Sequence, residues 1–294
     1  MLKQQALSYT EHIVQRDAYH IYAREYPGEE PTILLMHGFP DNMHLYDRLA
    51  PWLSPSRRVV TFDFLGWGES SKPAGYPYTA GNQTWDVDAV IEQLHLQQLV
   101  LVAHDASGPP AIDWALDHAD RVAALVLLNT YYCTMPPLRP PEAIRLYSTP
   151  LVRSVARVVS KAFHNWLFRK MYWWQVSRFM SKAEDREVFL PLLYQQFAAT
   201  PGAQPAFFRL NEDLLFTVRD RTKRIPQMNA FRRPVRIIFG ASDPYLNAGV
   251  ARRFHELFLT SDLFLLSNAR HFVQIDEPEK VAQLLLSTPL AGAT

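Results

Sequence analysis

The sequence predicts an α/β fold with a mostly parallel central sheet, helices on both faces of that sheet and a helical insertion. Short apolar runs, typical of buried strands, alternate with segments of helical spacing. This alternation stops in the middle of the chain and then resumes. Because 48% of the 294 residues are hydrophobic and 20% are charged, the chain can fill a core, which excludes a disordered tail, a collagen and a coiled coil.

The first part of the chain gives strand and helix signals in turn. Apolar or alternating runs bounded by turn residues predict strands at Ala18–Ala23, Thr32–Met36, Arg58–Phe62, Leu99–Ala103 and Ala123–Leu128. Apolar residues at helical spacing predict the intervening helices Met43–Leu53, Thr79–Leu94 and Pro110–Leu116. Strands separated by helices are the pattern of a parallel sheet.

Strand signals are missing between Cys133 and about Ala230. This stretch predicts helices rich in Phe, Tyr and Trp at Arg145–Ser160, Ala162–Met180, Glu184–Ala199 and Pro205–Val218. Alternation then resumes with the expected strands Val235–Phe239 and Leu263–Leu266 and the expected helices Ala248–Phe258 and Pro278–Ser287. We therefore expect residues 1–132 and 231–294 to form one α/β core, and residues 133–230 to form a helical cap inserted into it.

Charge is divided unevenly between these parts. The whole chain holds 30 Lys or Arg and 29 Asp or Glu, a net charge of +1, which gives no reason to expect nucleic acid as a partner. Residues 133–230 hold 15 basic and 7 acidic side chains, a difference of +8, which leaves the rest of the chain at −7. A solvated outer helix face explains this charge, and attraction of an anionic substrate or a membrane surface is the alternative.

The remaining composition predicts a cytoplasmic protein with no transmembrane segment. The single cysteine, Cys133, excludes an internal disulfide and a cysteine-rich zinc site. Met1 to Asp17 contains no continuous apolar stretch for a signal peptide, and no run approaches the ~18 apolar residues of a membrane span. No ligand spacing such as His-x-x-x-His lies beside acids, so we expect neither a metal nor a cofactor.

The turn after the strand Leu99–Ala103 has the pattern of a nucleophile elbow. Small residues at Ala103, Ser107 and Gly108 bracket Asp105 at the offsets where larger side chains would clash. Ser107 would be the nucleophile only if the frame moved by two residues, which would place Asp105 and Pro109 at the small-residue positions. The pattern therefore predicts Asp105 as the nucleophile, and we expect the neighbouring His104 to be structural.

Motifs in a fixed order give the chain a resemblance to the α/β-hydrolase superfamily. These motifs are His37-Gly38-Phe39-Pro40, Asp63-Phe64-Leu65-Gly66-Trp67-Gly68-Glu69-Ser70, the elbow Ala103–Gly108, Gly240-Ala241-Ser242-Asp243-Pro244 and Asn268-Ala269-Arg270-His271-Phe272. Within that superfamily the chain resembles the aspartate-nucleophile branch of epoxide hydrolases and haloalkane or haloacetate dehalogenases, and most closely the epoxide hydrolases. The resemblance covers nearly the whole chain except the insertion, and it implies the α/β-hydrolase fold with a helical cap (lid).

An aspartate nucleophile indicates attack on a saturated carbon. A serine would leave an ether there, whereas a carboxylate leaves an ester that water can cleave at its carbonyl. We expect His271 to activate that water, and Asp243 to hold the imidazole and stabilise its charged form. The backbone N–H groups of Phe39 and Ala106 would then donate to the oxyanion that forms when the ester is attacked.

The identity of the leaving group depends on residues around the nucleophile and in the cap. Dehalogenases of this branch resemble one another in a Trp or an Arg directly after the nucleophile, where this chain has Ala106. The resemblance to epoxide hydrolases implies two cap tyrosines that hydrogen-bond the epoxide oxygen. One expected position is Phe208, and Tyr147 is the nearest candidate for the other, with Tyr131, Tyr132, Tyr172 and Tyr194 as alternatives.

The sequence is thus interpreted as an epoxide hydrolase that makes vicinal diols through an alkyl-aspartyl ester on Asp105. The alternatives are a haloalkane or haloacetate dehalogenase with the same Asp-His-Asp triad and a non-catalytic binding protein of the same fold. The expected partner is a small hydrophobic molecule, an epoxide, under the aromatic cap that contains Trp166, Tyr172, Trp173 and Trp174. A homodimer is left open.

Overall fold

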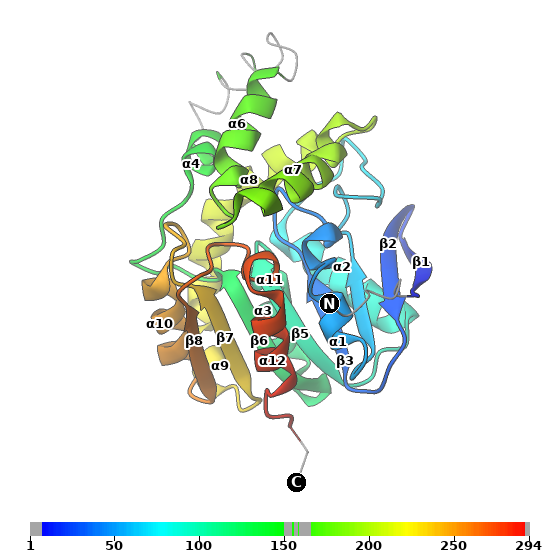
Figure 1. Ribbon diagram of the computed structural model, residues 1–294, viewed down its shortest axis with the longest axis vertical. Coiled ribbons are helices and arrows are strands. Elements are labelled where there is room, and N and C mark those ends of the chain that lie inside the picture. The colour runs from blue at the N-terminus through cyan, green and yellow to red at the C-terminus, as the bar shows by residue number, and fades with distance from the viewer. Residues whose placement is uncertain (1–7, 150–154, 156–157, 159–165, 292–294) are drawn as a thin grey trace.

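The computed structural model describes residues 8–149, 155, 158 and 166–291, and its centre is an 8-stranded sheet (Figure 1). The strands lie in the order β1-β2-β4-β3-β5-β6-β7-β8. Their bounds are Thr10–Arg16 (β1), Tyr19–Tyr26 (β2), Thr32–Met36 (β3), Val59–Phe62 (β4), Leu99–Asp105 (β5), Val122–Thr130 (β6), Val235–Gly240 (β7) and Ser261–Leu266 (β8). From β4 to β8 every neighbouring pair is parallel, so the predicted fold class is confirmed.

Two antiparallel strands extend one edge of the sheet. Strand β1 pairs with β2, and β2 pairs with β4. The sequence predicted β2 but not β1, whose residues Thr10–Arg16 are mostly polar and largely exposed. An edge strand of this kind lacks the continuous apolar run by which buried strands are recognised.

Helices cover the sheet. Helices α1 (Ala50–Leu53) and α12 (Pro278–Leu286) pack against each other on one side, and α2 (Ala80–Gln93) packs against α3 (Gly108–Asp117) on the other (Figure 1). The single helix expected at Met43–Leu53 is in fact two short pieces, the 3-10 helix Met43–Tyr46 and α1, which has a proline in its first turn. The remaining helices outside the four main cap helices are α9 (Ile225–Ala230), α10 (Ala248–Leu257), α11 (Val273–Asp276) and the 3-10 helices Ala119–Arg121 and Thr222–Arg224.

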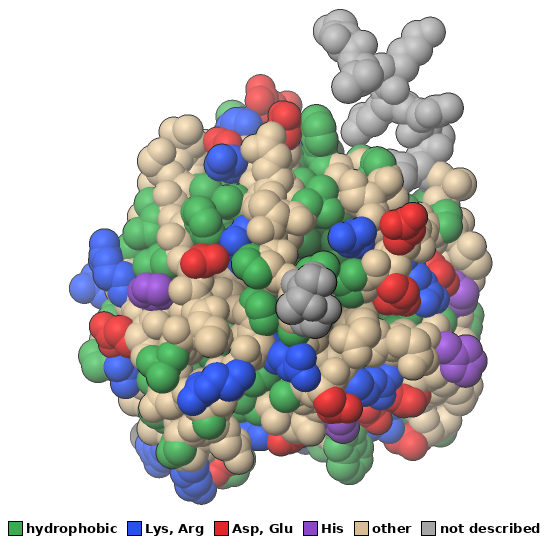
Figure 2. Space-filling model, turned by 90° about the horizontal axis from the view of Figure 1, so that it is seen from below, with side chains coloured by type: hydrophobic (Ala, Val, Ile, Leu, Met, Phe, Trp, Pro, Cys, Tyr) green, Lys and Arg blue, Asp and Glu red, His purple; other side chains and the backbone are tan. Residues whose placement is uncertain are grey.

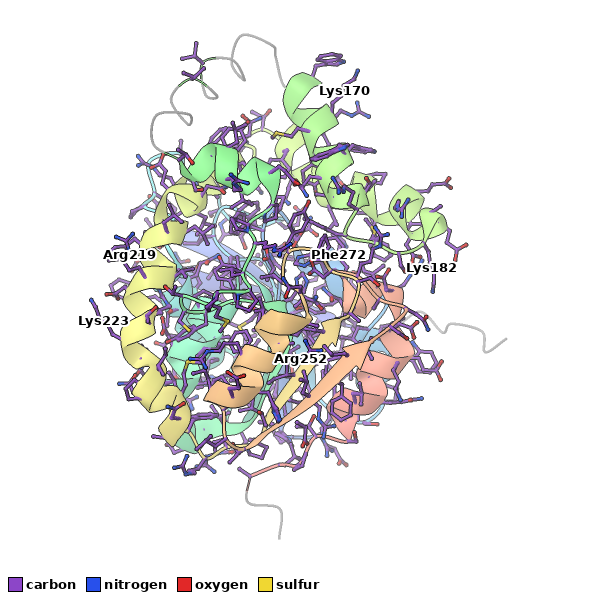
Figure 3. All side chains as sticks on the ribbon, turned by 90° about the vertical axis from the view of Figure 1, so that its left-hand side faces the viewer. Lys170, Lys182, Arg219, Lys223, Arg252 and Phe272 are labelled. Atoms are coloured by element: carbon purple, nitrogen blue, oxygen red, sulfur yellow. The ribbon has the colours of Figure 1, made fainter. Side chains whose placement is uncertain are left out.

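The cap lies between β6 and β7 in the chain, above the edge of the sheet where the parallel strands end (Figure 1). Its described helices are α4 (Glu142–Ser148), α6 (Trp166–Ser177), α7 (Ala183–Ala198) and α8 (Gln204–Arg221). Where the helix Arg145–Ser160 was expected, α4 begins earlier and ends at Ser148, and Val155 and Val158 are also helical. Residues 150–154, 156–157, 159–160 and 162–165 of the expected helices lie outside the described part. Lys170 lies near the outer end of α6 (Figure 3). On the face of the molecule opposite the cap, basic and acidic side chains are interspersed (Figure 2).

A buried ion-pair network fastens the cap to the core. Asp113 on α3 accepts hydrogen bonds from Arg221 Nε at 2.7 Å, from Arg224 Nη1 at 2.9 Å and from the Tyr132 hydroxyl at 2.6 Å. Each charge is therefore partnered, which is the condition under which burying it is tolerated.

None of the described helices is both long and apolar enough to span a membrane.

Replacing Gly108 with Ala should destabilise the fold. A Cβ there would lie 2.1 Å from Thr130 Oγ1 and 2.3 Å from the carbonyl oxygen of Tyr131, so the backbone must shift. We expect the free energy of unfolding, measured by chemical denaturation, to fall by about 1–3 kcal/mol. Gly75→Ala is the matched control because nothing lies within 4 Å of the added Cβ, and unfolding of both variants at the wild-type denaturant concentration would contradict the packing argument.

Candidate active site

The predicted elbow is a tight turn between β5 and α3. Asp105, the last residue of β5, has φ of +48°, a conformation that side chains other than glycine rarely adopt. A Cβ on Gly38 would lie 2.5 Å from Asp105 Cβ, so only glycine lets the two loops approach this closely. Ser107 Oγ donates to the carbonyl of Met36 at 2.8 Å and accepts from His104 N at 2.8 Å. Ser107 therefore holds the turn, and Asp105 is the side chain presented forward.

Asp105 is partly buried, and its carboxyl receives backbone donors. Phe39 N donates to Asp105 Oδ2 at 3.2 Å. Burial raises the pKa of Asp105 to about 6, although the charge of His271 and the N–H groups of Phe39 and Ala106 act in the opposite direction. The structure thus brings both expected oxyanion donors, Phe39 and Ala106, to the predicted nucleophile.

His271 and Asp243 meet at the edge of the sheet. His271 Nδ1 lies 2.7 Å from Asp243 Oδ2, and Asp243 also accepts from Asn129 Nδ2 at 2.9 Å and from Tyr245 N at 2.8 Å. A proton on Nδ1 shared with Asp243 leaves Nε2 for other chemistry. Burial opposes protonation of His271, but the charge and hydrogen bond of Asp243, with the charge of Asp105, raise its pKa to about 9. Despite burial, His271 holds the pKa of Asp243 below its ordinary value.

His104 contacts both the backbone and the ring of His271. Its Nε2 lies 3.1 Å from the carbonyl oxygen of His271, and the two rings are 4.7 Å apart between centroids. Burial and the charge of His271 hold the pKa of His104 well below its ordinary value, so its ring is neutral. This placement agrees with the structural role expected for it.

Asp41 is a buried acid near the site that the sequence analysis did not single out. Neither of its carboxyl oxygens has a hydrogen-bond partner among the described residues. Burial and the charge of Asp105 raise the pKa of Asp41 well above its ordinary value, and Asp41 in turn helps to raise the pKa of His271. The sequence contains no pattern that distinguishes Asp41 from an ordinary loop residue, because the shift of its pKa depends on burial in the folded chain.

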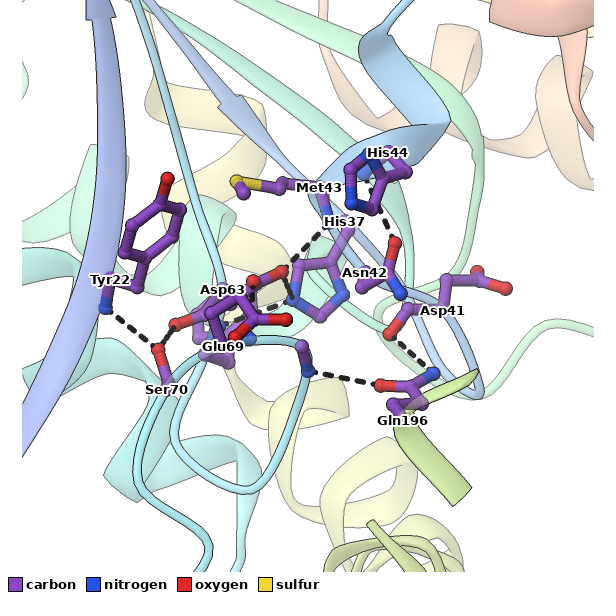
Figure 4. A network of polar contacts seen from close by, with 12 residues as sticks. Tyr22, His37, Asp41, Asn42, Met43, His44, Asp63, Glu69, Ser70 and Gln196 are labelled. Atoms are coloured by element: carbon purple, nitrogen blue, oxygen red, sulfur yellow. Dashed lines mark hydrogen bonds and ion pairs between the residues drawn. The ribbon is translucent and has the colours of Figure 1, made fainter. Parts of the chain in front are cut away.

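The loop that carries Asp41 is tied to its neighbours by polar contacts (Figure 4). Gln196 on α7 donates to the carbonyl of Asp41 at 3.1 Å and accepts from Gly68 N at 3.1 Å. His37 Nε2 accepts from Phe64 N at 3.1 Å, and Asp63 accepts from Met43 N at 2.8 Å. His37 thus has a scaffold role, and the cap helix α7 is bonded directly to the loop that supplies Phe39.

A cavity of about 370 Å³ lies between the core and the cap, with Asp105 and His271 in its wall. Most of its described lining is apolar, including Phe39, Met135, Leu138, Ile144, Met171, Val176, Phe179, Phe207, Leu214 and Val218. The lining also contains Tyr131, Tyr172 and Tyr245. An apolar cavity with few polar groups suits a small hydrophobic molecule.

The candidate tyrosines occupy different places. Tyr147 is buried but is not among the residues that line the cavity, and its ring packs against Phe207 and Phe208 with centroid separations of 5.4 Å and 5.1 Å. Tyr132 donates to Asp113, and the Tyr194 ring packs against Trp173 with a centroid separation of 4.8 Å. Of the tyrosines considered from the sequence, Tyr131 and Tyr172 form part of the cavity wall.

No group of three or more His, Cys, Asp or Glu side chains in the described part could hold a metal ion.

An eight-stranded sheet, an elbow after β5 and an acid–histidine pair after β7 and β8 define a hydrolase architecture. Residues 31–278 match the family described as the alpha/beta hydrolase fold, and the chain belongs to that family.

Dehalogenases are among the relatives of this chain. It is 34% identical to a fluoroacetate dehalogenase of Burkholderia sp. over 145 residues, a match that covers 48% of this chain and only 43% of that relative. It is 25% identical to haloalkane dehalogenase 2 of Mycobacterium tuberculosis over 264 residues, or 88% of each chain. The solved structure of the haloalkane dehalogenase DbeA from Bradyrhizobium elkani superposes with a TM-score of 0.75, covers 95% of this chain and 98% of that chain at 19% identity, and shows the shared fold.

Replacing Asp105 with Asn should lower the pKa of His271. The negative charge of Asp105 is one of the reasons that this pKa lies at about 9, so its removal should move the value toward the ordinary one near ~6.5. A pH titration of the His271 ring signals by NMR measures the change. Asp220→Asn removes an exposed charge on α8 as the control, and an equal effect of both variants, or no effect of Asp105→Asn, would contradict the coupling.

Proposed function

We propose that the protein hydrolyses the carbon–halogen bond of a small, mainly apolar alkyl halide through an alkyl-aspartyl ester on Asp105. The observation that carries this proposal is the elbow itself, which presents a carboxylate instead of a hydroxyl to an apolar cavity. A carboxylate that attacks a saturated carbon forms an ester, and an ester can be hydrolysed to regenerate the enzyme.

In the first step a carboxylate oxygen of Asp105 attacks the carbon that bears the halogen. A carbon–oxygen bond forms, the carbon–halogen bond breaks, and the halide leaves with the bonding electron pair. This step needs the ionised form of Asp105. Since its pKa lies at about 6, the first step should slow as the pH falls through that value.

In the second step water attacks the carbonyl carbon of the ester. His271 Nε2 takes a proton from the water, the oxyanion is held by the N–H groups of Phe39 and Ala106, and collapse releases the alcohol, which takes up a proton from His271. Forming the ester removes the negative charge of Asp105, one of the charges that raise the pKa of His271. His271 therefore becomes a neutral base more readily once the ester is present.

Two observations favour a halide over the epoxide oxygen that the sequence interpretation placed first. The fluoroacetate and haloalkane dehalogenases described above are relatives of this chain. Most hydroxyls in the described cavity wall are also engaged: Tyr172 donates to the carbonyl of Pro40 at 3.2 Å, and Tyr245 donates to Glu142 at 2.7 Å. A halide can leave without a proton, whereas an alkoxide needs a donor.

Epoxide hydrolysis is the second candidate because of Tyr131. Tyr131 belongs to the cavity wall, and burial together with the charge of Asp105 raises the pKa of its hydroxyl well above the ordinary value, so the group keeps its proton. A donor in that position could hydrogen-bond an epoxide oxygen as the ring opens. Tyr147, the donor expected from the sequence, packs against Phe207 and Phe208 instead.

Replacing His271 with Gln should allow the first step and block the second. With a bromoalkane, this variant should release about one equivalent of bromide per enzyme, and intact-protein mass spectrometry should show the mass of the added alkyl group. Wild-type enzyme and the control His255→Gln, an exposed histidine on α10, should turn over continuously. If the wild-type enzyme forms a diol from an epoxide and releases no halide from any bromoalkane, the second candidate replaces the proposal. If the His271→Gln variant forms no adduct with either substrate class, the proposal is wrong.

A further inference from the structure

A second, more open hollow adjoins the catalytic cavity at the junction of cap and core. Its volume is about 430 Å³, and it is lined by Leu138, Arg139, Pro140, Glu142, Arg145, Arg178, Pro244 and Tyr245. Leu138, Arg139, Pro140 and Tyr245 also line the catalytic cavity. The two spaces therefore share a wall, and a molecule that extends out of the cavity past Tyr245 meets this hollow.

Three arginines, Arg139, Arg145 and Arg178, line the hollow, and we call them the arginine rim. The guanidinium groups of Arg139 and Arg145 make no hydrogen bond or ion pair with any residue that the structure describes. The guanidinium of Arg178 lies 4.8 Å from the centre of the Trp174 ring, a cation–π contact that leaves its N–H edge open. Such an excess of donors over acceptors is what an anion would satisfy.

Glu142 is the one acid in the lining, and it is already engaged. Its carboxylate accepts from the Tyr245 hydroxyl at 2.7 Å, and Gln175 Nε2 donates to the same hydroxyl at 3.0 Å. The hydrogen bond from Tyr245, together with the charges of Arg178 and Arg145, lowers the pKa of Glu142, so it stays ionised. Three positive charges against one negative charge leave the hollow positive.

The segment that contains the rim is basic as a whole. Residues 133–230 carry 15 basic and 7 acidic side chains. Lys170 lies near the outer end of α6, Arg219 lies on α8, and Lys223 follows α8 in the chain and is paired with Asp220 (Figure 3). Charges of one sign around a hollow raise the local concentration of ligands of the opposite sign.

We propose that the arginine rim binds the carboxylate of an amphiphilic substrate whose apolar chain fills the cavity and whose reacting carbon lies at Asp105. This inference rests on the proposed function, because it assigns the substrate class of the same catalytic site. A planar carboxylate matches the paired N–H groups of a guanidinium, which lysine does not offer. The rim would thus fix the end of the chain remote from the reacting carbon.

The test compares two bromoalkanes of matched chain length, one with a carboxylate at the end remote from bromine and one with a methyl group there. Replacing both Arg139 and Arg145 with Met should raise the KM for the carboxylate at least about tenfold and leave the KM for the neutral compound within about twofold. High salt should reduce the preference of the wild type for the carboxylate. Arg252→Met, an exposed arginine on α10, is the matched control and should change neither KM.

Equal losses for both substrates would show a structural effect, and no loss for either would show that the rim binds nothing; both outcomes overturn the proposal. Titration calorimetry with an unreactive alkanoate keeps the rim testable if no halide is released, because the rim predicts binding to wild type and weaker binding to the double variant. Anionic phospholipid vesicles form a further arm of the experiment. Sedimentation of wild type with the vesicles, without binding of the free alkanoate, would assign the rim to a membrane surface and overturn the substrate proposal.

Discussion

Partial burial of the Asp105 carboxyl, which by itself favours the uncharged acid, is the constraint on which the rest of the site depends. The turn with positive φ places this carboxyl at the end of β5, in the wall of the largely apolar cavity. Two backbone N–H groups and the charge of His271 work against the effect of burial and hold the pKa of Asp105 at about 6. At neutral pH the nucleophile is therefore mostly ionised, and its partial burial reduces the hydration that would weaken its attack.

The same charges make the two chemical steps follow one another. In the resting site Asp105 and Asp243 both favour a protonated His271, which is the wrong form for a base. Alkylation of Asp105 removes one of these charges, which lowers the pKa of His271. His271 therefore becomes a neutral base at the stage when water has an ester to attack. The cap completes the site through Gln196, which joins α7 to the core loops, and through the Asp113 network, which joins α8 to α3. A substrate chain is thus enclosed between two parts of the molecule that are bonded to each other.

The sequence predicted those features that are encoded locally. The buried strands appear as continuous apolar runs, and the elbow requires small residues at fixed offsets from Asp105, so both could be found without a structure. His271 and Asp243 could be proposed as partners because each follows an expected strand in a motif, and their separation of 2.7 Å follows from the sheet order. By contrast, Tyr147 was chosen by its distance along the chain, and packing against Phe207 and Phe208 keeps it out of the cavity wall. Asp41 and the arginine rim depend on burial and on contacts between distant segments, for which no local pattern exists.

The ester on Asp105 is the central claim, and a single turnover in water enriched in oxygen-18 tests it most directly. With enzyme in excess over substrate, the alcohol should carry the unlabelled oxygen that came from Asp105, and the peptide that contains Asp105 should gain one labelled oxygen when it is analysed by mass spectrometry. Label in the alcohol with none in that peptide would mean that water attacks the substrate directly, and would contradict the account.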